Sequence, residues 1–262
     1  MTRNVSEMCP KHGKAGAVAP RVRRGFTLVD VLVSLTVITV LMGLLLPSLS
    51  GIRETTRRVV CSSNIRQFGL GIAMYTEDNR GYIPYSNFIS WQESDPKYRP
   101  DRMMIVRDVN NNAWDGLGLL FSRQYTPAAG IYYCPSHKGE HRKEVYESAW
   151  SSTQGEIVSN FHYRGVSPGG NALLRLWTGS SAIVADGLAT QQDYNHVEGN
   201  NTLRADISVA WVVDRFGQIN NVLAKSEEDM QAPLRVRMAW QEIDRAANAA
   251  EAAMGGGPTG PN

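Results

Sequence analysis

The sequence predicts an α+β fold, in which one long N-terminal helix precedes a small antiparallel β-sheet. Residues 26–80 have the pattern of a single helix that is apolar on every side at first and amphipathic afterwards. Beyond residue 81, short runs rich in β-branched and aromatic residues alternate with turn-forming residues, which is typical of antiparallel strands. We therefore expect the apolar stripe of the helix to cover one face of the sheet.

Residues 1–25 form a basic leader. They contain six of the 27 Lys and Arg residues and one of the 25 acidic residues, which leaves 21 basic and 24 acidic residues for the rest of the chain. The chain as a whole has a net charge of only +2, so its charge gives no indication of nucleic-acid binding. A basic head on a mildly acidic body predicts a targeting segment followed by a soluble domain.

Residues 26–50 form the predicted transmembrane part of the helix. Asp30 is the one strongly polar side chain in this stretch, which would span about 36 Å at 1.5 Å per residue. A secretory signal is shorter and ends at a cleavage site with small residues, and a core helix is rarely so apolar over this length. The basic leader predicts a cytoplasmic N-terminus, although three arginines (Arg53, Arg57 and Arg58) flank the other end.

Residues 51–80 are the predicted amphipathic continuation of the helix. Asn79 and Arg80 then lead to Gly81, which we expect to be the left-handed cap. The apolar stripe needs a partner, and the following domain is the expected one. The stripe consists of Ile52, Val59, Ile65, Phe68, Ile72 and Tyr75.

Residues 81–230 are the predicted globular α+β domain, and residues 231–262 a C-terminal helix with a flexible tail. Within the domain, 93–112 has the composition of a surface loop. Short helices are expected within 114–121 and 140–150, and strands over 131–135, 157–164, 181–186 and 202–214.

Residues 25–84 resemble the prepilin-type N-terminal cleavage and methylation segment, most specifically through Arg24-Gly25-Phe26-Thr27-Leu28-Val29-Asp30. The downstream sequence resembles one branch of pseudopilin-like proteins of type II secretion, found in planctomycete-type bacteria. These proteins carry a domain of unknown function with an H-x9-DG motif. The matching stretches are 61–70, 78–84, Tyr133-Cys134-Pro135-Ser136, Asp186 and the pair His196 and Asp206.

This resemblance implies a pilin-like fold and a defined maturation route. A prepilin peptidase would cut between Gly25 and Phe26 on the cytoplasmic side, and the new Phe26 amine would be methylated. The subunit would then pack through its helix against other pilin or pseudopilin subunits. In the family an acidic residue pairs with the free amine of a neighbouring subunit, which offsets the cost of a carboxylate in the bilayer. Asp30 stands where the family usually has Glu.

The H-x9-DG motif is incomplete, because Ile207 follows Asp206 where the family has Gly. An Asp-Gly pair suits a tight hairpin that needs positive φ at both central residues. A β-branched residue disfavours that conformation. We therefore expect either a different turn or a continuous strand at this point.

Three sets of residues are candidates for chemistry. Cys61 and Cys134 would form a disulfide after export to an oxidising compartment, or remain two buried thiols; their spacing excludes a zinc ribbon. His196 and Asp206 would be a catalytic or metal-binding pair, or His196 would donate a hydrogen bond that fixes a loop. Major pseudopilins, which the chain resembles more distantly, bind calcium, and the carboxylates here of suitable type are Asp186, Asp193 and Glu198. No other cofactor is expected.

We therefore predict a structural subunit of a type II secretion pseudopilus or a type IV pilus-like system. It would be anchored once in the inner membrane, with its C-terminal domain exported. The sequence contains no G-x-S-x-G and no H-E-x-x-H motif, so we expect no enzymatic activity. The alternatives are a singly anchored, exported binding protein that does not polymerise and an exported hydrolase built around His196.

Overall fold

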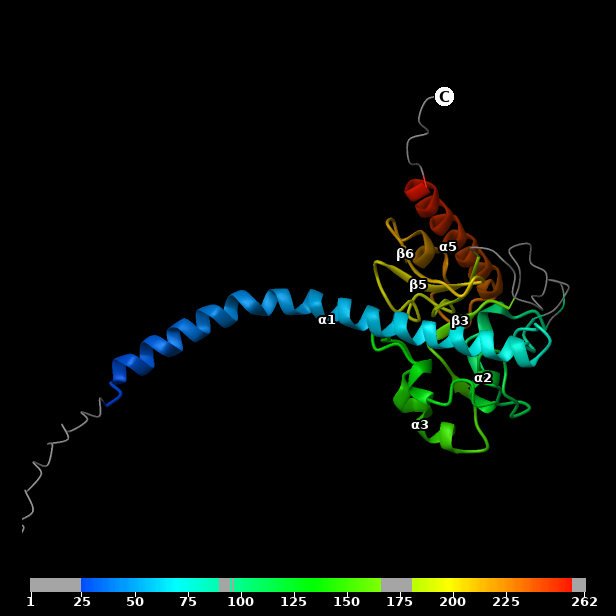
Figure 1. Cartoon of the computed structure of the whole chain (residues 1–262), viewed down its shortest axis with the longest axis horizontal. Coiled ribbons are helices and arrows are strands. Elements are labelled where there is room, and N and C mark those ends of the chain that lie inside the picture. The colour runs from blue at the N-terminus through cyan, green and yellow to red at the C-terminus, as the bar shows by residue number, and fades with distance from the viewer. Residues whose placement is uncertain (1–24, 90–94, 96, 166–180, 256–262) are drawn as a thin grey trace, which may run out of the picture. The chain divides into compact units, whose positions relative to one another are not determined.

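The computed structural model describes residues 25–89, 95, 97–165 and 181–255, and the leader residues 1–24 lie outside this range. The described residues form a mixed α+β protein, as the sequence predicts (Figure 1). The chain divides into two compact units, Met1–Leu49 and Ser50–Asn262.

Helix α1 (Leu28–Asp78) is 51 residues long and is unbroken at Pro47. In the first unit, Leu28–Leu45 has a mean hydropathy of 2.5, and the described residues bury none of it. This segment is long and apolar enough to cross a membrane. An exposed apolar surface as large as that of Leu28–Leu45 indicates contact with lipid or with another protein.

The C-terminal end of α1 is closed by a Schellman motif. The amide of Gly81 donates to the carbonyl of Thr76 at 2.7 Å, and Arg80 takes the left-handed conformation with a φ of 58°. The expectation that Gly81 is the left-handed cap is therefore only partly right. Gly81 has a positive φ of 82°, but Arg80 occupies the capping position itself.

The second unit contains a four-stranded antiparallel sheet whose strands follow one another in chain order. The strands are β3 (Phe161–Tyr163), β4 (Ala182–Asp186), β5 (Gly199–Arg204) and β6 (Val209–Val213). Two further short strands pair separately, β1 (Ile105–Arg107) with β2 (Ile157–Val158). The predicted 181–186 strand is thus present as β4.

A helix covers each face of the four-stranded sheet. The second half of α1 lies on one side of the sheet, where Phe68 and Leu203 belong to one buried cluster, and α5 (Ala232–Gly255) lies on the other, where Trp240 and Val212 belong to a second cluster (Figure 1). Close approach of α1 to β5 depends on Gly69, where an added Cβ would lie 2.8 Å from the Leu203 side chain. Because both faces are covered, every residue of β4 is buried.

Short helices and turns connect these layers. They are η1 (Pro100–Arg102), α2 (Gly118–Ser122), η2 (Ala129–Tyr132), α3 (Lys143–Ser151) and α4 (Gln218–Val222). The Arg107 side chain is 2 % exposed and donates to four main-chain carbonyls at the end of α3 and in the loop after it. These hydrogen bonds compensate the buried guanidinium for the hydration that it loses.

Two predicted strands are different in the structure. Residues 129–132 form η2 where a strand over 131–135 was expected. The 157–164 strand is broken, because the Ser159 hydroxyl bonds locally to the main chain of Phe161 and separates β2 from β3. Apolar content alone does not distinguish a short buried strand from a short buried helix or from a strand that is interrupted.

The expected 202–214 strand is a hairpin of β5 and β6. The Ile207 amide donates to the Arg204 carbonyl at 2.9 Å, and Ile207 has a φ of 67°. This is a three-residue loop in which a left-handed residue follows a type I turn. Ile207 therefore adopts a left-handed conformation that is unfavourable for a β-branched residue, and the turn differs from the tight Asp-Gly hairpin, which is the first of the two alternatives expected from the sequence.

Candidate functional site

The segment around the predicted cleavage point is open. Phe26 is 86 % exposed, and a Cβ added to Gly25 would meet no atom of the described residues within 4 Å. Asp30 accepts a hydrogen bond from the Thr27 amide at 3.0 Å, and the Thr27 hydroxyl accepts one from the Asp30 amide at 3.2 Å. This reciprocal pair has the form of a capping box and explains why α1 begins at Leu28.

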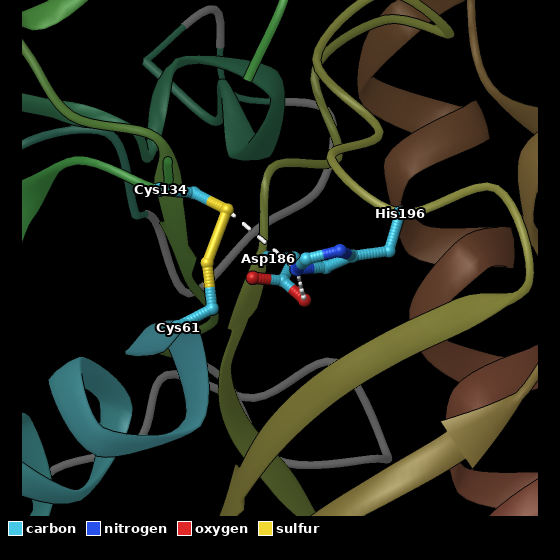
Figure 2. Close-up of side chains that lie close together, drawn as sticks. All are labelled: Cys61, Cys134, Asp186 and His196. Atoms are coloured by element: carbon cyan, nitrogen blue, oxygen red, sulfur yellow. Dashed lines mark hydrogen bonds and ion pairs between the residues drawn. A yellow bond between two sulfur atoms is a disulfide. The ribbon is translucent and has the colours of Figure 1, made fainter. Parts of the chain in front are cut away.

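A second group of polar side chains is buried in the domain (Figure 2). Cys61 on α1 and Cys134 after η2 form a disulfide, with their Cα atoms 5.4 Å apart. The two cysteines are 73 residues apart in sequence, so the bond ties α1 to a distant loop. In the chain-entropy model a loop of this length gives roughly 4 kcal/mol of stabilisation.

His196 lies beside this disulfide, in the loop before β5, and is 2 % exposed. Its Nε2 atom is 3.6 Å from Cys134 Sγ and 3.8 Å from Asp186 Oδ2 (Figure 2). Its Nδ1 atom is 2.6 Å from Glu54 Oε1. Hydrogen bonds from His196 and Ser136 hold the pKa of Glu54 below its usual value, although partial burial acts in the opposite direction. Glu54 is therefore a carboxylate that accepts from Nδ1–H.

Asp186 ends β4 and is fully buried. Its Oδ2 atom accepts from the main-chain amide of Asn201 at 2.7 Å and from the Asn201 side chain at 3.3 Å. Among the described residues, its Oδ1 atom has no hydrogen-bond donor of ordinary geometry. Burial raises the pKa of Asp186 to about 6, against the lowering influence of His196, Asn201 and Asn195.

The structure separates the predicted pair of His196 and Asp206. His196 precedes β5, and Asp206 follows it in the hairpin turn, so a six-residue strand lies between them. At about 3.3 Å per residue the two ends of such a strand are roughly 20 Å apart. Asp206 is exposed and accepts from the amide and hydroxyl of Ser208. His196 is paired instead with Glu54, Asp186 and Cys134.

The three carboxylates considered for calcium have different surroundings. Asp186 faces His196 and Asn201, Asp193 accepts from the amide and hydroxyl of Thr190, and Glu198 is exposed and lies 3.7 Å from Arg58. Among the described residues, the side chains close enough to share one ion are a different group, which contains Asp186 but neither of the other two.

Glu54 and Asn201 are site residues that the sequence argument missed. Glu54 lies seven residues before Cys61, about two helical turns, and therefore on the same face of α1. That spacing was a usable signal once Cys61 was considered a site residue. Asn201 offered no signal, because its role depends on the pairing of β5 with β4.

Comparison with known families gives two matches. A model described as "Protein of unknown function (DUF1559)" matches residues 50–190, and one described as "Prokaryotic N-terminal methylation motif" matches residues 20–46. Neither the curated proteins nor the solved structures contain a match to the chain. The first match includes Cys61, Cys134 and Asp186, and the second includes Gly25, Phe26 and Asp30.

Proposed function

Because the chain belongs to the DUF1559 family of proteins of unknown function and begins with a prepilin-type methylation motif, we propose that it is a membrane-anchored structural subunit of a pseudopilus or pilus-like filament. In this proposal a prepilin peptidase removes residues 1–25, and the mature chain assembles with other pilin or pseudopilin subunits through α1. The observation that carries the proposal is a single carboxylate, Asp30, at the start of the otherwise apolar segment Leu28–Leu45, which lies within the match to the methylation motif.

The cost of Asp30 in a bilayer supports assembly as its role. Insertion scales assign about 2.5–3.5 kcal/mol to a carboxylate at the centre of a membrane helix. Removal of residues 1–25 would create an amine at Phe26, and the amine of a neighbouring subunit is a partner for the carboxylate. A charge-assisted hydrogen bond of this kind contributes about 1.5–3 kcal/mol, enough to offset most of the cost.

We propose an inner-membrane location with one membrane crossing. The basic leader would remain in the cytoplasm, and the domain from Ser50 onward would be exported. In that compartment the Cys61–Cys134 disulfide is a stable form. Secretion of a protein substrate by a type II system is the process in which such a subunit would act.

We propose a non-enzymatic role for the domain. His196 is committed to Glu54 at one nitrogen and faces Cys134 and Asp186 at the other, and the Cys134 sulfur is held in a disulfide. The hydrolase alternative predicts that His196→Ala destroys a turnover while leaving the domain as stable as before. Loss of a measured turnover at unchanged stability would favour that alternative.

Mass spectrometry of the mature protein tests the processing step. We expect a chain that begins at Phe26 with one added methyl group, and a Gly25→Leu variant that keeps its leader, because a bulky side chain obstructs close approach of the protease. A wild-type chain that retains Met1, or that is cut elsewhere, would contradict the proposal.

Co-assembly tests the role of Asp30. We expect Asp30→Ala to reduce recovery in sheared filaments at least tenfold, because a lost contact of about 1.4 kcal/mol per subunit corresponds to that factor. Asp206→Ala, which removes an exposed carboxylate from the domain, is the matched control and should assemble normally. Equal behaviour of Asp30→Ala and wild type would support the singly anchored binding protein instead.

A further inference from the structure

The buried group beside the disulfide has the composition of a metal site. Cys61, Cys134, Asp186 and His196 each offer one ligand atom, and these atoms lie within 4.8 Å of one another. All four residues are buried, and they come from α1, the loop after η2, the end of β4 and the loop before β5. Two sulfurs, one imidazole nitrogen and one carboxylate oxygen are ligand types that zinc accepts in tetrahedral sites.

The neighbours of these ligands already hold them in a suitable orientation. His196 Nδ1 lies 2.6 Å from Glu54 Oε1, and Nε2 faces the group at 3.6 Å from Cys134 Sγ. The Ser136 amide donates to Cys134 Sγ at 3.4 Å. Asn201 donates to Asp186 Oδ2, and Oδ1 has no hydrogen-bond donor of ordinary geometry within the described part of the chain. A carboxylate behind a ligating histidine and donors to the other ligands are characteristic of metal sites.

The disulfide does not by itself explain this arrangement. A disulfide is satisfied by apolar surroundings, whereas a fully buried carboxylate next to an imidazole costs free energy unless a positive charge or more hydrogen bonds compensate it. His196 Nε2 lies 3.8 Å from Asp186 Oδ2, which is too far for a hydrogen bond. A bound cation would satisfy both groups at once.

A route to the site and a counter-charge are also present. A cavity beside it is lined by Glu54, Ser136, Asn195, His196, Arg58 and Lys138. The Glu54 side chain is 48 % exposed, so the route reaches solvent at its edge. Two thiolates, Asp186 and Glu54 would exceed the charge of one divalent ion, and Arg58 and Lys138 would offset part of that excess.

We propose that the dithiol form of this protein binds one zinc ion through Cys61 Sγ, Cys134 Sγ, His196 Nε2 and Asp186 Oδ1, and that the disulfide form does not. A dithiol reductant would supply two electrons and two protons to the Cys61–Cys134 bond and become a disulfide itself. The two thiols then lose their protons to solvent as they bind the ion. Exchange with an added disulfide compound, which is itself reduced to a dithiol and takes two protons from solvent, re-forms the Cys61–Cys134 bond and releases the metal ion.

Cobalt serves as the probe, because it takes the place of zinc and absorbs visible light strongly when its ligands are tetrahedral. The full chain is purified in detergent with Cys9→Ser, which removes the one other thiol, and is reduced with a phosphine. We expect one cobalt ion per reduced chain, with tetrahedral visible bands and a thiolate-to-metal absorption in the near ultraviolet. Added zinc should displace the cobalt, and the oxidised chain should take up neither ion.

Variants identify the ligands. His196→Gln and Asp186→Asn should each weaken cobalt binding at least a hundredfold, whereas their matched controls His141→Gln and Asp193→Asn should bind as wild type does. Glu54→Gln, at a half-exposed position with little risk to folding, should weaken binding about 10–100-fold through its contact with His196. The proposal is overturned if the reduced chain binds no cobalt, if the spectrum is octahedral, or if Glu54→Gln, His196→Gln and Asp186→Asn all bind as wild type does. None of these outcomes depends on filament assembly.

Discussion

His162 lies in β3 with no exposed surface, and its Nε2–H donates to the Pro100 carbonyl at 2.7 Å. Its Nδ1 atom is buried and has no hydrogen-bond partner among the residues that the structure describes. Burial lowers the pKa of His162 to about 4, because a protonated ring would lose its hydration in this position, although the bond to Pro100 and the charge of Asp101 act against the shift. His162 is therefore a neutral hydrogen-bond donor, and its protonation in acid would destabilise the folded protein.

The pKa of His162 predicts a specific loss of stability in acid. The unfolded chain takes up the proton at about pH 6.5 and the folded chain at about pH 4, so stability is lost as the pH falls through this window. Relative to His162→Gln, the wild-type free energy of unfolding should fall by about 2 kcal/mol between about pH 7 and about pH 5. Urea denaturation in detergent, followed by tryptophan fluorescence, measures this difference.

The comparison with His162→Gln isolates one group. Burial also raises the pKa of Asp115 and of Asp186 to about 6, which makes the folded state less stable as the pH rises from about 4 to 6. Both carboxyl groups are present in the two proteins, so their effect cancels in the difference. If the free energy of unfolding changes equally with pH in both proteins, protonation of His162 does not destabilise the folded state.

The β5–β6 hairpin shows, at the scale of an element, how packing can sustain an unfavourable turn residue. Ile207 has a φ of 67°, a conformation that costs roughly 1–2 kcal/mol for a residue with a Cβ. Its side chain is partly buried and reaches α1, where its Cγ2 atom lies 3.1 Å from the position that a Cβ on Gly69 would take. Contact with α1 offsets part of the backbone cost.

Two small substitutions at Ile207 separate these contributions. Both Ile207→Gly and Ile207→Ala remove the contact with α1, but only glycine adopts a positive φ without a steric cost. We expect Ile207→Gly to be more stable than Ile207→Ala by about 1 kcal/mol in urea denaturation. The same pair at Ser208, which has no positive φ, should not favour glycine. A more stable alanine variant at 207 would refute the argument.

At the scale of the whole molecule, the chain combines an apolar unit with a folded domain. The Leu28–Leu45 segment buries nothing within the described chain, whereas the domain covers both faces of its sheet. The domain therefore contains its own core, and the first unit depends on lipid or other subunits for burial. In the proposed filament, Asp30 is the polar contact that selects the register between neighbouring helices.

The length of the side chain at position 30 should affect the strength of the proposed contact between neighbouring subunits. In the proposed contact, glutamate reaches one methylene further towards the Phe26 amine of a neighbour. We expect Asp30→Glu to increase recovery in sheared filaments, by up to about tenfold if the added contact contributes about 1.4 kcal/mol. Asp30→Asn, similar in size but uncharged, should reduce recovery. If Asp30→Asn assembles as well as wild type, the carboxylate charge is not what holds the neighbours together.

The sequence by itself determined the features that depend on local composition. Hydropathy over a continuous stretch predicted the membrane-competent part of α1. Periodic apolar residues predicted the buried stripe correctly for Ile65, Phe68, Ile72 and Tyr75 and wrongly for Ile52 and Val59, which are exposed. The motif from Gly25 to Asp30 identified the prepilin type, which the methylation-motif match confirms. These features can be predicted from the sequence because each depends on residues that are close together in the chain.

Only the tertiary structure brought the residues of the candidate metal site together and determined where the expected 157–164 and 202–214 strands break or turn. Glu54 and His196 are 142 residues apart, and no pattern in a single sequence indicates that they lie 2.6 Å from each other. The hairpin at Ile207 and the break at Ser159 depend on contacts with α1 and on local hydroxyl bonding, which override the apolar pattern. A site assembled from α1, β4 and two loops exists only after the sheet has paired and α1 has packed against it, because long-range packing sets these distances.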